Sequence, residues 1–362
     1  MIPAELYRPI FYNLLLVLTL ITAYQLYFNL SAVRVYRVKV ENENWTWMLA
    51  LLLAVFIGFR PISGVFVDTT TYAGLFSIYQ NSDLSEILLV NDDYLFSMFM
   101  FYSSKIMSVN IFFFVISVIY IFCPLWALRR IFPNNVWLAF LMFISAFSFF
   151  AYGTNGLRNG MATSVFLLAL SYSNKKWLAI LLMIVSVGIH KSMILPTFAF
   201  LCILFYRNTK FYIFIWLLTI PVSLVSGGYW ENLFGDLGFD DRLSFMTTEA
   251  DAASFSSTGF RWDFLLYSSI PILVGYYVVF KRKYNSEIYS YLLNVYIISN
   301  AFWILVIRAN FSNRFAYLSW FLYPIVLLYP FLKFPLWKKQ YNMVAFMLVL
   351  HFTFTYMMWL IK

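Results

Sequence analysis

Apolar residues run in long stretches along most of the chain, and short polar segments separate them. A helix needs about 20 residues to cross the roughly 30 Å hydrocarbon core of a bilayer, so these stretches predict transmembrane helices. Some are shorter than this, which indicates tilted helices, broken helix ends or boundaries that lie a few residues away. The twelve stretches lie at 10–30, 45–59, 110–128, 135–152, 158–173, 177–190, 192–206, 211–227, 264–280, 288–307, 315–332 and 341–361. The pattern predicts an all-α polytopic membrane protein, with 1–362 as a single transmembrane domain of about 12 helices.

Local sequence signals decide how the first stretch and the segment 94–107 are interpreted. The first stretch lacks a small-residue cleavage site, so we expect a retained helix rather than a signal peptide. The segment 94–107 is apolar but too short to span. We expect it to be an interfacial or re-entrant helix that begins after Asn91, Asp92 and Asp93, which are typical helix-capping residues. A short tilted thirteenth span is the alternative.

The composition agrees with a membrane protein. Of 362 residues, 62% are hydrophobic and 11% are charged, against about a quarter charged in soluble proteins. Aromatic residues make up 22%, as expected for a chain with many interfacial rings. Cys123 and Cys202 lie in apolar stretches and there are two histidines, so the sequence favours neither a disulfide framework nor a zinc site.

The net charge of +9 would suggest a nucleic-acid partner in a soluble protein, but in a membrane protein we expect no nucleic acid. Here the distribution of the basic residues between the loops indicates the orientation in the membrane. With the N-terminus outside, 15 of the 25 Lys and Arg residues fall in alternate loops with three acids, and the opposite side has a net charge of −3. These basic residues are Arg34, Arg37, Lys39, Arg129, Arg130, Lys175, Lys176, Arg207, Lys210, Lys281, Arg282, Lys283, Lys333, Lys338 and Lys339. The positive-inside rule makes their side cytoplasmic and both termini periplasmic.

Two outer loops, 60–93 and 228–263, are longer than a helix connection requires. The second combines aromatic rings with acids and hydroxyls, a combination that suits sugars. An ordinary solvated loop with rings at the headgroup level is the alternative. The candidate glycan-binding residues are Trp230, Asp241, Arg242, Arg261, Trp262 and Asp263.

Four arginines lie at helix ends on the outer side: Arg60, Arg158, Arg308 and Arg314. An arginine in the apolar layer costs on the order of 2.5–3.5 kcal/mol, so each needs a partner or a ligand. Each arginine taken alone could extend its side chain to the lipid headgroups beside an acid such as Asp68 or Asp263. Converging from separate helices, they would instead form an anion site, because guanidinium groups match phosphate oxygens bidentately.

His190 and Asp68 are the candidate bases on the same side. Nearby cations would keep a histidine neutral and able to accept a proton, whereas they would make an aspartate a weaker base. We therefore expect His190 to be the base, with Asp68 orienting an arginine or a hydroxyl. We read His351, inside the last stretch, as a packing residue. The adjacent pairs Asp92-Asp93 and Asp240-Asp241 lack the spacing of a metal motif, so we expect neither a metal nor another cofactor.

Three segments resemble the EpsG/Wzy family of O-antigen and exopolysaccharide polymerases. They are GFRPISGVFVDTTTYAGLF with its "R…D…Y" pattern, the block YGTNGLRNGMATSVFLLALSYSNKKWLAILLMIVSVGIHKSMILP with its "NGxRxxxA" helix start, and NFSNRFAYLSWFLYPIVLLYP with its "NRF" motif. They occur in the family's order and cover most of 45–332. Asn159 replaces the family's usual glutamine after the central arginine, Arg158.

The resemblance implies an enzyme of the bacterial inner membrane, a glycosyltransferase with its active site facing the periplasm. It would move a growing glycan from undecaprenyl diphosphate to the non-reducing end of a new lipid-linked repeat unit. The four arginines would stabilise the leaving diphosphate, with Arg158 catalytic beside His190 and Asp68. The implied partners are the undecaprenyl-diphosphate-linked oligosaccharide, membrane lipids and a chain-length co-polymerase. Another lipid-linked sugar transferase, such as an O-antigen ligase, and a flippase or transporter are the alternatives. Charges gathered at one leaflet, with no visible repeat, disfavour transport.

Overall fold

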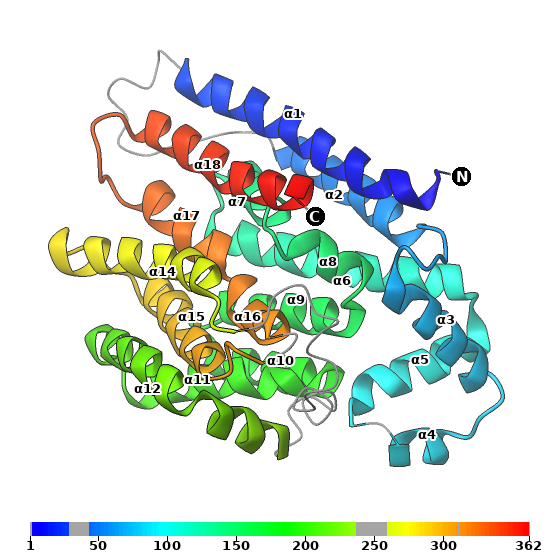
Figure 1. Ribbon diagram of the computed structural model, residues 1–362. Coiled ribbons are helices and arrows are strands. Elements are labelled where there is room, and N and C mark those ends of the chain that lie inside the picture. The colour runs from blue at the N-terminus through cyan, green and yellow to red at the C-terminus, as the bar shows by residue number, and fades with distance from the viewer. Residues whose placement is uncertain (1, 29–42, 91, 237–258, 310–311, 362) are drawn as a thin grey trace. The chain divides into compact units, whose positions relative to one another are not determined.

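The computed structural model describes residues 2–28, 43–90, 92–236, 259–309 and 312–361 (Figure 1). Every regular element in these ranges is a helix, which confirms the all-α prediction. Helices satisfy their own backbone hydrogen bonds, as a chain in a hydrocarbon solvent must.

All twelve predicted stretches are helical in the described residues. Seven of the helical segments there are long and apolar enough to cross a membrane, so the number of spans, twelve, stays a prediction. The seven are Ala4–Tyr27, Val109–Ile131, Thr209–Trp230, Trp262–Lys281, Glu287–Leu305, Arg314–Lys333 and Gln340–Ile361.

The remaining stretches form shorter helices. These are α2 (Glu43–Gly58), α9 (Leu157–Ser171), α10 (Lys176–Ile189) and α11 (Ile194–Phe205). The stretch 135–152 is broken into α7 (Val136–Ile144) and α8 (Phe149–Thr154), so a continuous helix was the wrong expectation there. Within the break, the hydroxyl of Ser145 donates to the carbonyl of Met142 at 3.1 Å.

The chain folds into two compact units. The first unit is Met1–His190 with Leu328–Lys362, and the second unit is Lys191–Leu327. The interpretation of the chain as one transmembrane domain stays a prediction.

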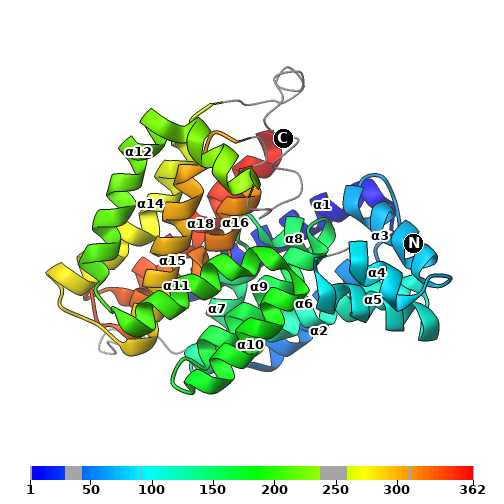
Figure 2. The ribbon, with the colours of Figure 1, turned by 90° about the horizontal axis from the view of Figure 1, so that it is seen from below.

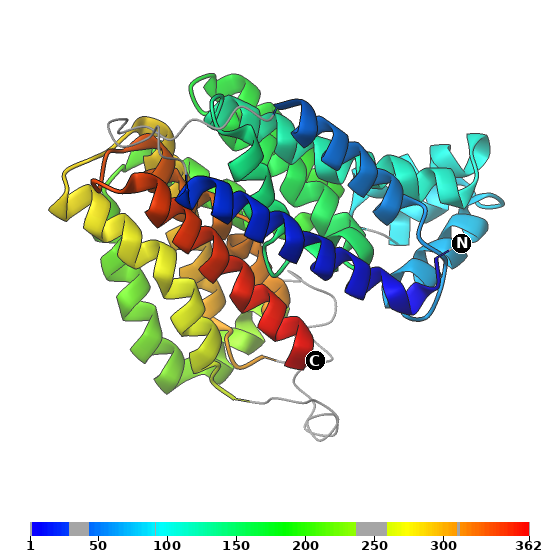
Figure 3. The same ribbon diagram turned by 90° about the horizontal axis from the view of Figure 1, so that it is seen from above.

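In the first unit, α6 (Val109–Ile131) packs against α2 and α9, and α9 packs against α10 (Figure 2). Helix α1 (Tyr7–Tyr27) lies alongside α18 (Gln340–Ile361), as Figure 3 shows. The hydroxyl of Ser164 on α9 donates to the carbonyl of Tyr120 on α6 at 2.9 Å, and Ser186 on α10 donates to the carbonyl of Ala162 at 2.7 Å. Small hydroxyl residues therefore tie the three central helices together.

The second unit is built around α15 (Glu287–Leu305), which packs against α11, α12 (Thr209–Asp236), α14 (Trp262–Tyr276) and α16 (Asn313–Trp320). The indole of Trp216 donates to the side chain of Asn300 at 2.8 Å, and Asn300 donates to Ser319 at 3.0 Å. This buried chain of hydrogen bonds crosses three helices. Helix α17 (Tyr323–Lys333) contains the boundary between the units.

The predicted outer loop 60–93 is largely helical. It contains α3 (Val67–Tyr79) and α4 (Leu84–Val90), and α5 (Tyr94–Ile106) follows. Helix α5 confirms a helix at 94–107. Its 13 residues extend about 20 Å at 1.5 Å per residue, well short of the roughly 30 Å hydrocarbon core. Both α3 and α4 pack against α5, and α5 packs against α10.

Candidate functional site

Three charged or titratable side chains meet in the first unit. The Nη1 atom of Arg158 lies 2.6 Å from Oδ2 of Asp93, and Nδ1 of His190 lies 2.9 Å from the same oxygen. Only 4% of the Asp93 side chain is exposed, against 16% for His190 and 36% for Arg158. A buried carboxylate thus contacts a histidine and an arginine whose side chains are both partly exposed.

Each of the three residues lies at the end of a helix. Asp93 is the N-cap residue of α5, Arg158 is the second residue of α9, and His190 is the C-cap residue of α10. The packing of α9 on α10 brings Arg158 and His190 together, and the packing of α5 on α10 adds Asp93. The sequence separation of 97 residues between Asp93 and His190 shows that tertiary packing alone builds this cluster.

The close approach of α5 to α10 depends on Gly188. A Cβ atom at this position would lie 2.5 Å from Cδ1 and 2.7 Å from Cγ of Leu95. Gly188 is two residues before His190, and Leu95 is two residues after Asp93. The glycine therefore leaves room for the helix that brings the carboxylate to the imidazole.

The prediction that Asp93 belongs to a capping sequence is confirmed for its position before α5, but its side chain does not cap the helix. Asp93 occupies the N-cap of α5, but its side chain makes no capping hydrogen bond. Its oxygens instead lie close to Arg158 and His190. Sequence reasoning missed this role because the sequence NDD before a helix has an adequate local explanation.

Tyr72 of α3 is the fourth member of the cluster. Its hydroxyl accepts a hydrogen bond of 2.9 Å from Nε of Arg158, so the guanidinium spans Tyr72 and Asp93 with two different nitrogens. Burial raises the pKa of Tyr72 and the charge of Arg158 lowers it, while the charges of Asp68 and Asp93 raise it further. The phenol therefore stays neutral at physiological pH, and Asp68 lies near it in the first turn of α3.

The carboxylate defines the chemistry available to His190. An ionised Asp93 accepts a hydrogen bond from Nδ1, so a neutral imidazole carries its proton there and presents the lone pair of Nε2. The sequence predicts cations beside this histidine, whereas the structure also places the carboxylate of Asp93 2.9 Å from its ring.

Arg60 has a different environment. Only 2% of the residue is exposed, and its guanidinium donates to the hydroxyl of Thr69 and to the carbonyls of Ile57 and Thr154 at 2.8–3.2 Å. The ring of Phe113 lies 5.3 Å from its Cζ atom. Burial lowers the pKa of Arg60 to about 10, so it remains a cation at neutral pH. This geometry favours a brace between α2, α3 and α8 over the predicted contact with a diphosphate.

The other two predicted anion-binding arginines belong to the second unit. Arg308 is exposed and donates to the carbonyl of Leu224 at 3.1 Å, and its side chain passes 3.3 Å from the Cβ position of Gly227. Arg314 is half-buried in α16. Since the four arginines are divided between the two units, their convergence stays a prediction.

Four predicted glycan-binding residues can be placed in the second unit. The indole of Trp230 donates to the hydroxyl of Ser226 at 3.1 Å near the end of α12. Arg261 and Asp263 form a bidentate pair, with nitrogen to oxygen distances of 3.0 and 2.7 Å, beside the exposed Trp262. Asp241 and Arg242 lie outside the described residues. Sugar binding by these residues stays a prediction.

No group of three or more His, Cys, Asp or Glu side chains in the described part of the chain could hold a metal ion. Asp93 and His190 are only two such ligands, and the positive charge of Arg158 beside Asp93 disfavours a bound cation. What the cluster offers is an oriented imidazole beside a guanidinium. Such a pair suits proton transfer next to an anion.

Comparison with known proteins gives one result. The model of the EpsG family matches residues 44–362, which is most of the chain and includes Asp93, Arg158 and His190. No curated protein and no solved structure shows a significant match.

Proposed function

This chain belongs to the EpsG family, and on that premise we propose that it is a membrane-embedded polysaccharide polymerase. The proposed reaction transfers a growing glycan from undecaprenyl diphosphate to the non-reducing end of a lipid-linked repeat unit. The observation that carries the proposal is the convergence of Arg158 and His190 on the buried carboxylate of Asp93. Glycosyl transfer from a lipid diphosphate needs a base for the acceptor and a positive charge for the leaving group, and this cluster has both.

In the proposed step, an acceptor hydroxyl oxygen attacks the anomeric carbon of the donor glycan. A new glycosidic C–O bond forms, and the bond from the anomeric carbon to the diphosphate oxygen breaks. The electron pair of that bond leaves with undecaprenyl diphosphate. The hydroxyl proton moves to Nε2 of His190, while Asp93 holds Nδ1 and stabilises the imidazolium that results.

Arg158 has the second role. It is held in place through Nη1 by Asp93 and through Nε by Tyr72, and about a third of its side chain remains exposed. A guanidinium fixed before the reaction stabilises charge that develops on a diphosphate oxygen without having to reorganise. Arg308, Arg314 and the residues of the outer segment 228–263 would contact the lipid-linked partners, as predicted from the sequence.

We place the enzyme in the bacterial inner membrane with both termini and the cluster on the periplasmic side and with twelve spans. The support is the asymmetry of basic residues and the shortness of α5, which is consistent with an interfacial helix rather than a thirteenth span. Reporter fusions after Arg130 and after Lys283 should behave as cytoplasmic. Alkaline phosphatase activity at either point would overturn this orientation.

The function can be tested by deleting the gene in its host and separating the lipid-linked and surface glycans on a gel. A polymerase defect leaves core bearing a single repeat unit, or loss of the free polymer where the product is an exopolysaccharide. Bare core would instead point to a ligase or flippase and would contradict the proposal. Wild-type protein supplied in trans should restore the ladder of polymer lengths.

Two variants of His190 separate a base from a structural residue. The amide of His190→Asn can still donate to Asp93 from the position of Nδ1, whereas His190→Gln keeps the length of the side chain. Neither can accept the hydroxyl proton, so both should lower the polymerisation rate about 10²-fold or more. Near-normal turnover in His190→Asn would return His190 to a packing role.

A further inference from the structure

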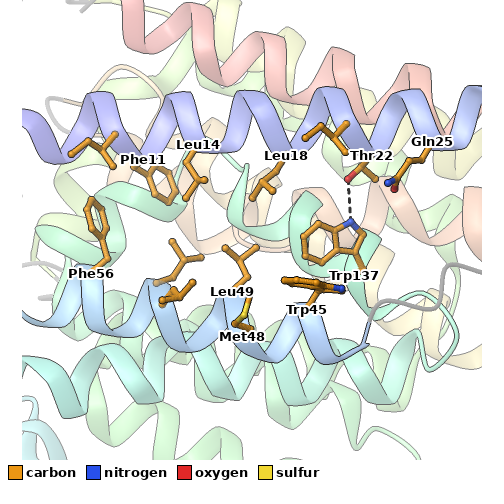
Figure 4. Close-up of a pocket in the computed structure, with 14 residues that line it drawn as sticks. Phe11, Leu14, Leu18, Thr22, Gln25, Trp45, Met48, Leu49, Phe56 and Trp137 are labelled. Carbon is orange, nitrogen blue, oxygen red and sulfur yellow. Dashed lines mark hydrogen bonds between the residues drawn. The ribbon is translucent and has the colours of Figure 1, made fainter.

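An apolar groove runs between α1 and α2 in the first unit (Figure 4). It has a volume of about 710 Å³, within the range of small-molecule binding sites. Helix α1 packs against α18, while α2 packs against α6 and α7, so the facing sides of α1 and α2 form the walls. Leu14 on one wall and Met48 on the other are 41% and 46% exposed, so the groove opens at the surface.

The lining is almost entirely hydrocarbon and aromatic along its length. Leu14 and Leu18 face Leu49 and Met48 across the middle, where the figure shows no polar side chain between the walls (Figure 4). The hydroxyl of Thr22 accepts a hydrogen bond of 3.1 Å from the indole of Trp137, so these polar atoms satisfy each other. A groove of this kind offers dispersion contacts to a long apolar chain and offers few partners to a polar ligand.

The two ends of the groove differ. Gln25 and Trp45 lie at one end, and Phe11 and Phe56 lie at the other (Figure 4). The end lined by Phe11 and Phe56 lies near the start of α1, at Tyr7, and near the end of α2. The distribution of basic residues predicts that these helix ends are on the periplasmic side.

A continuous series of contacts leads from this end toward the Arg158 cluster. The ring of Phe56 stacks on Tyr7 at 4.6 Å, and Tyr7 meets the edge of Phe66 at 5.6 Å. Arg60 lies over Phe66, with its Cζ atom 5.8 Å from the ring centre, and donates to Thr69. Thr69 is one helical turn before Tyr72, which binds Arg158. All of these residues belong to the first unit, and Phe66 and Arg60 are buried, so packed side chains link this end of the groove to the cluster.

We infer that this groove binds the isoprenoid tail of the lipid-linked substrate, with the diphosphate toward Arg158. The inference rests on the proposed function for the identity of the lipid. The groove suits a linear hydrocarbon chain that lies parallel to α1 and α2 and carries its charge at one end. Bulk lipid is as apolar as the tail, so shape and dispersion contacts select the long chain and fix its direction.

The inference can be tested with the full-length protein in phospholipid nanodiscs, by measuring the binding of radiolabelled undecaprenyl diphosphate and of the short-chain farnesyl diphosphate. Leu14→Trp and Met48→Trp place an indole in the groove from opposite walls. Val17→Trp and Leu51→Trp are matched controls, because these residues are 52% and 53% exposed on the same helices and do not line the groove.

Each groove variant should weaken the binding of undecaprenyl diphosphate about tenfold, or about 1.4 kcal/mol, and leave that of farnesyl diphosphate within about twofold. The controls should match the wild type with both lipids. If the groove variants bind the long lipid as the controls do, the groove holds bulk lipid only and the inference fails. Absence of long-lipid binding to the wild type would also overturn it.

The polymer ladder is a separate readout. A protein that shows the chain-length selectivity but makes no polymer would refute the proposed function and leave the groove assigned to a lipid tail. A protein that makes polymer and binds the long lipid equally well in all four variants would refute the groove alone. The two failures are therefore distinguishable.

Discussion

Arg60 and Arg158 have the same description in the sequence, because each is an arginine at a helix end on the predicted outer side. Their surroundings differ. Arg60 is enclosed and donates to a hydroxyl and two carbonyls, whereas Arg158 spans a carboxylate and a phenol and remains partly exposed. The hydrogen bonds of Arg60 therefore stabilise the fold, whereas the guanidinium of Arg158 remains accessible to a ligand. A guanidinium is a candidate for anion binding only if the protein leaves part of it accessible.

The largest expected effect concerns Arg158. Arg158→Ala should lower polymerisation about 10³-fold while the protein still accumulates in the membrane, because Asp93 keeps its contact with His190. Arg158→Lys should restore little, because an ammonium cannot reach Asp93 and Tyr72 from two fixed nitrogens. The measurement is the rate of polymer formation by purified, reconstituted protein.

Arg129→Ala is the matched control for this change. Arg129 belongs to the same unit and also pairs with a carboxylate, Glu43, at 2.8 Å, but it lies on the predicted cytoplasmic side. Its replacement should leave polymerisation within about twofold, as expected for an exposed ion pair. Wild-type ladder lengths in Arg158→Lys would sink the argument that a fork is needed.

The next effect should appear in stability rather than in catalysis. Arg60→Ala removes the buried guanidinium that donates to the hydroxyl of Thr69 and to the carbonyl of Thr154, and only the 3.2 Å hydrogen bond from Thr69 to Thr154 remains between them. This loss should cost about 2–4 kcal/mol. We expect a lower unfolding midpoint and less protein in the membrane, with near-normal turnover per folded molecule. The measurement is thermal unfolding in detergent together with specific activity. If the variant were fully stable and inactive, Arg60 would have the diphosphate-binding role that was predicted from the sequence.

The smallest effect should come from Tyr72. Tyr72→Phe removes the acceptor for Nε of Arg158 but keeps the ring and the contact of Arg158 with Asp93. The loss of one positioning hydrogen bond should slow polymerisation about fivefold, or about 1 kcal/mol. The change should fall on kcat more than on KM if Tyr72 aims the guanidinium at the transition state. A loss as large as that of Arg158→Ala would mean that Tyr72 contacts the substrate itself.

The helices could be predicted from the sequence because hydropathy is a local signal. Each predicted apolar stretch is helical, and the errors concern continuity, as in the break between α7 and α8. The break could not be predicted because the interrupted stretch contains neither proline nor an adjacent charge, and Ser145 and Ser148 are weak signals.

The candidate site was only partly predictable for the opposite reason. Arg158 and His190 stand out as polar residues at the ends of apolar stretches. Asp93 does not, because it has an adequate local role as a capping residue, and Tyr72 is marked only as the tyrosine of the "R…D…Y" segment that resembles the family. Their assignment depends on contacts across 65 to 97 residues of chain. Gly188, in a helix of large apolar residues, was the one local sign that another helix approaches there.

The acceptors of Arg60 also set an order of events during synthesis. Ile57 and Thr69 lie within nine residues of Arg60, so two acceptors are made with it, but the carbonyl of Thr154 follows 94 residues later. At about 5–20 residues per second, the ribosome needs about 5–19 s to supply it. Until then the nascent chain carries a guanidinium that lacks one of its three acceptors. A chain that stalls before α8 therefore cannot complete the hydrogen bonds of Arg60, so this part of the fold forms only after α8 has been made.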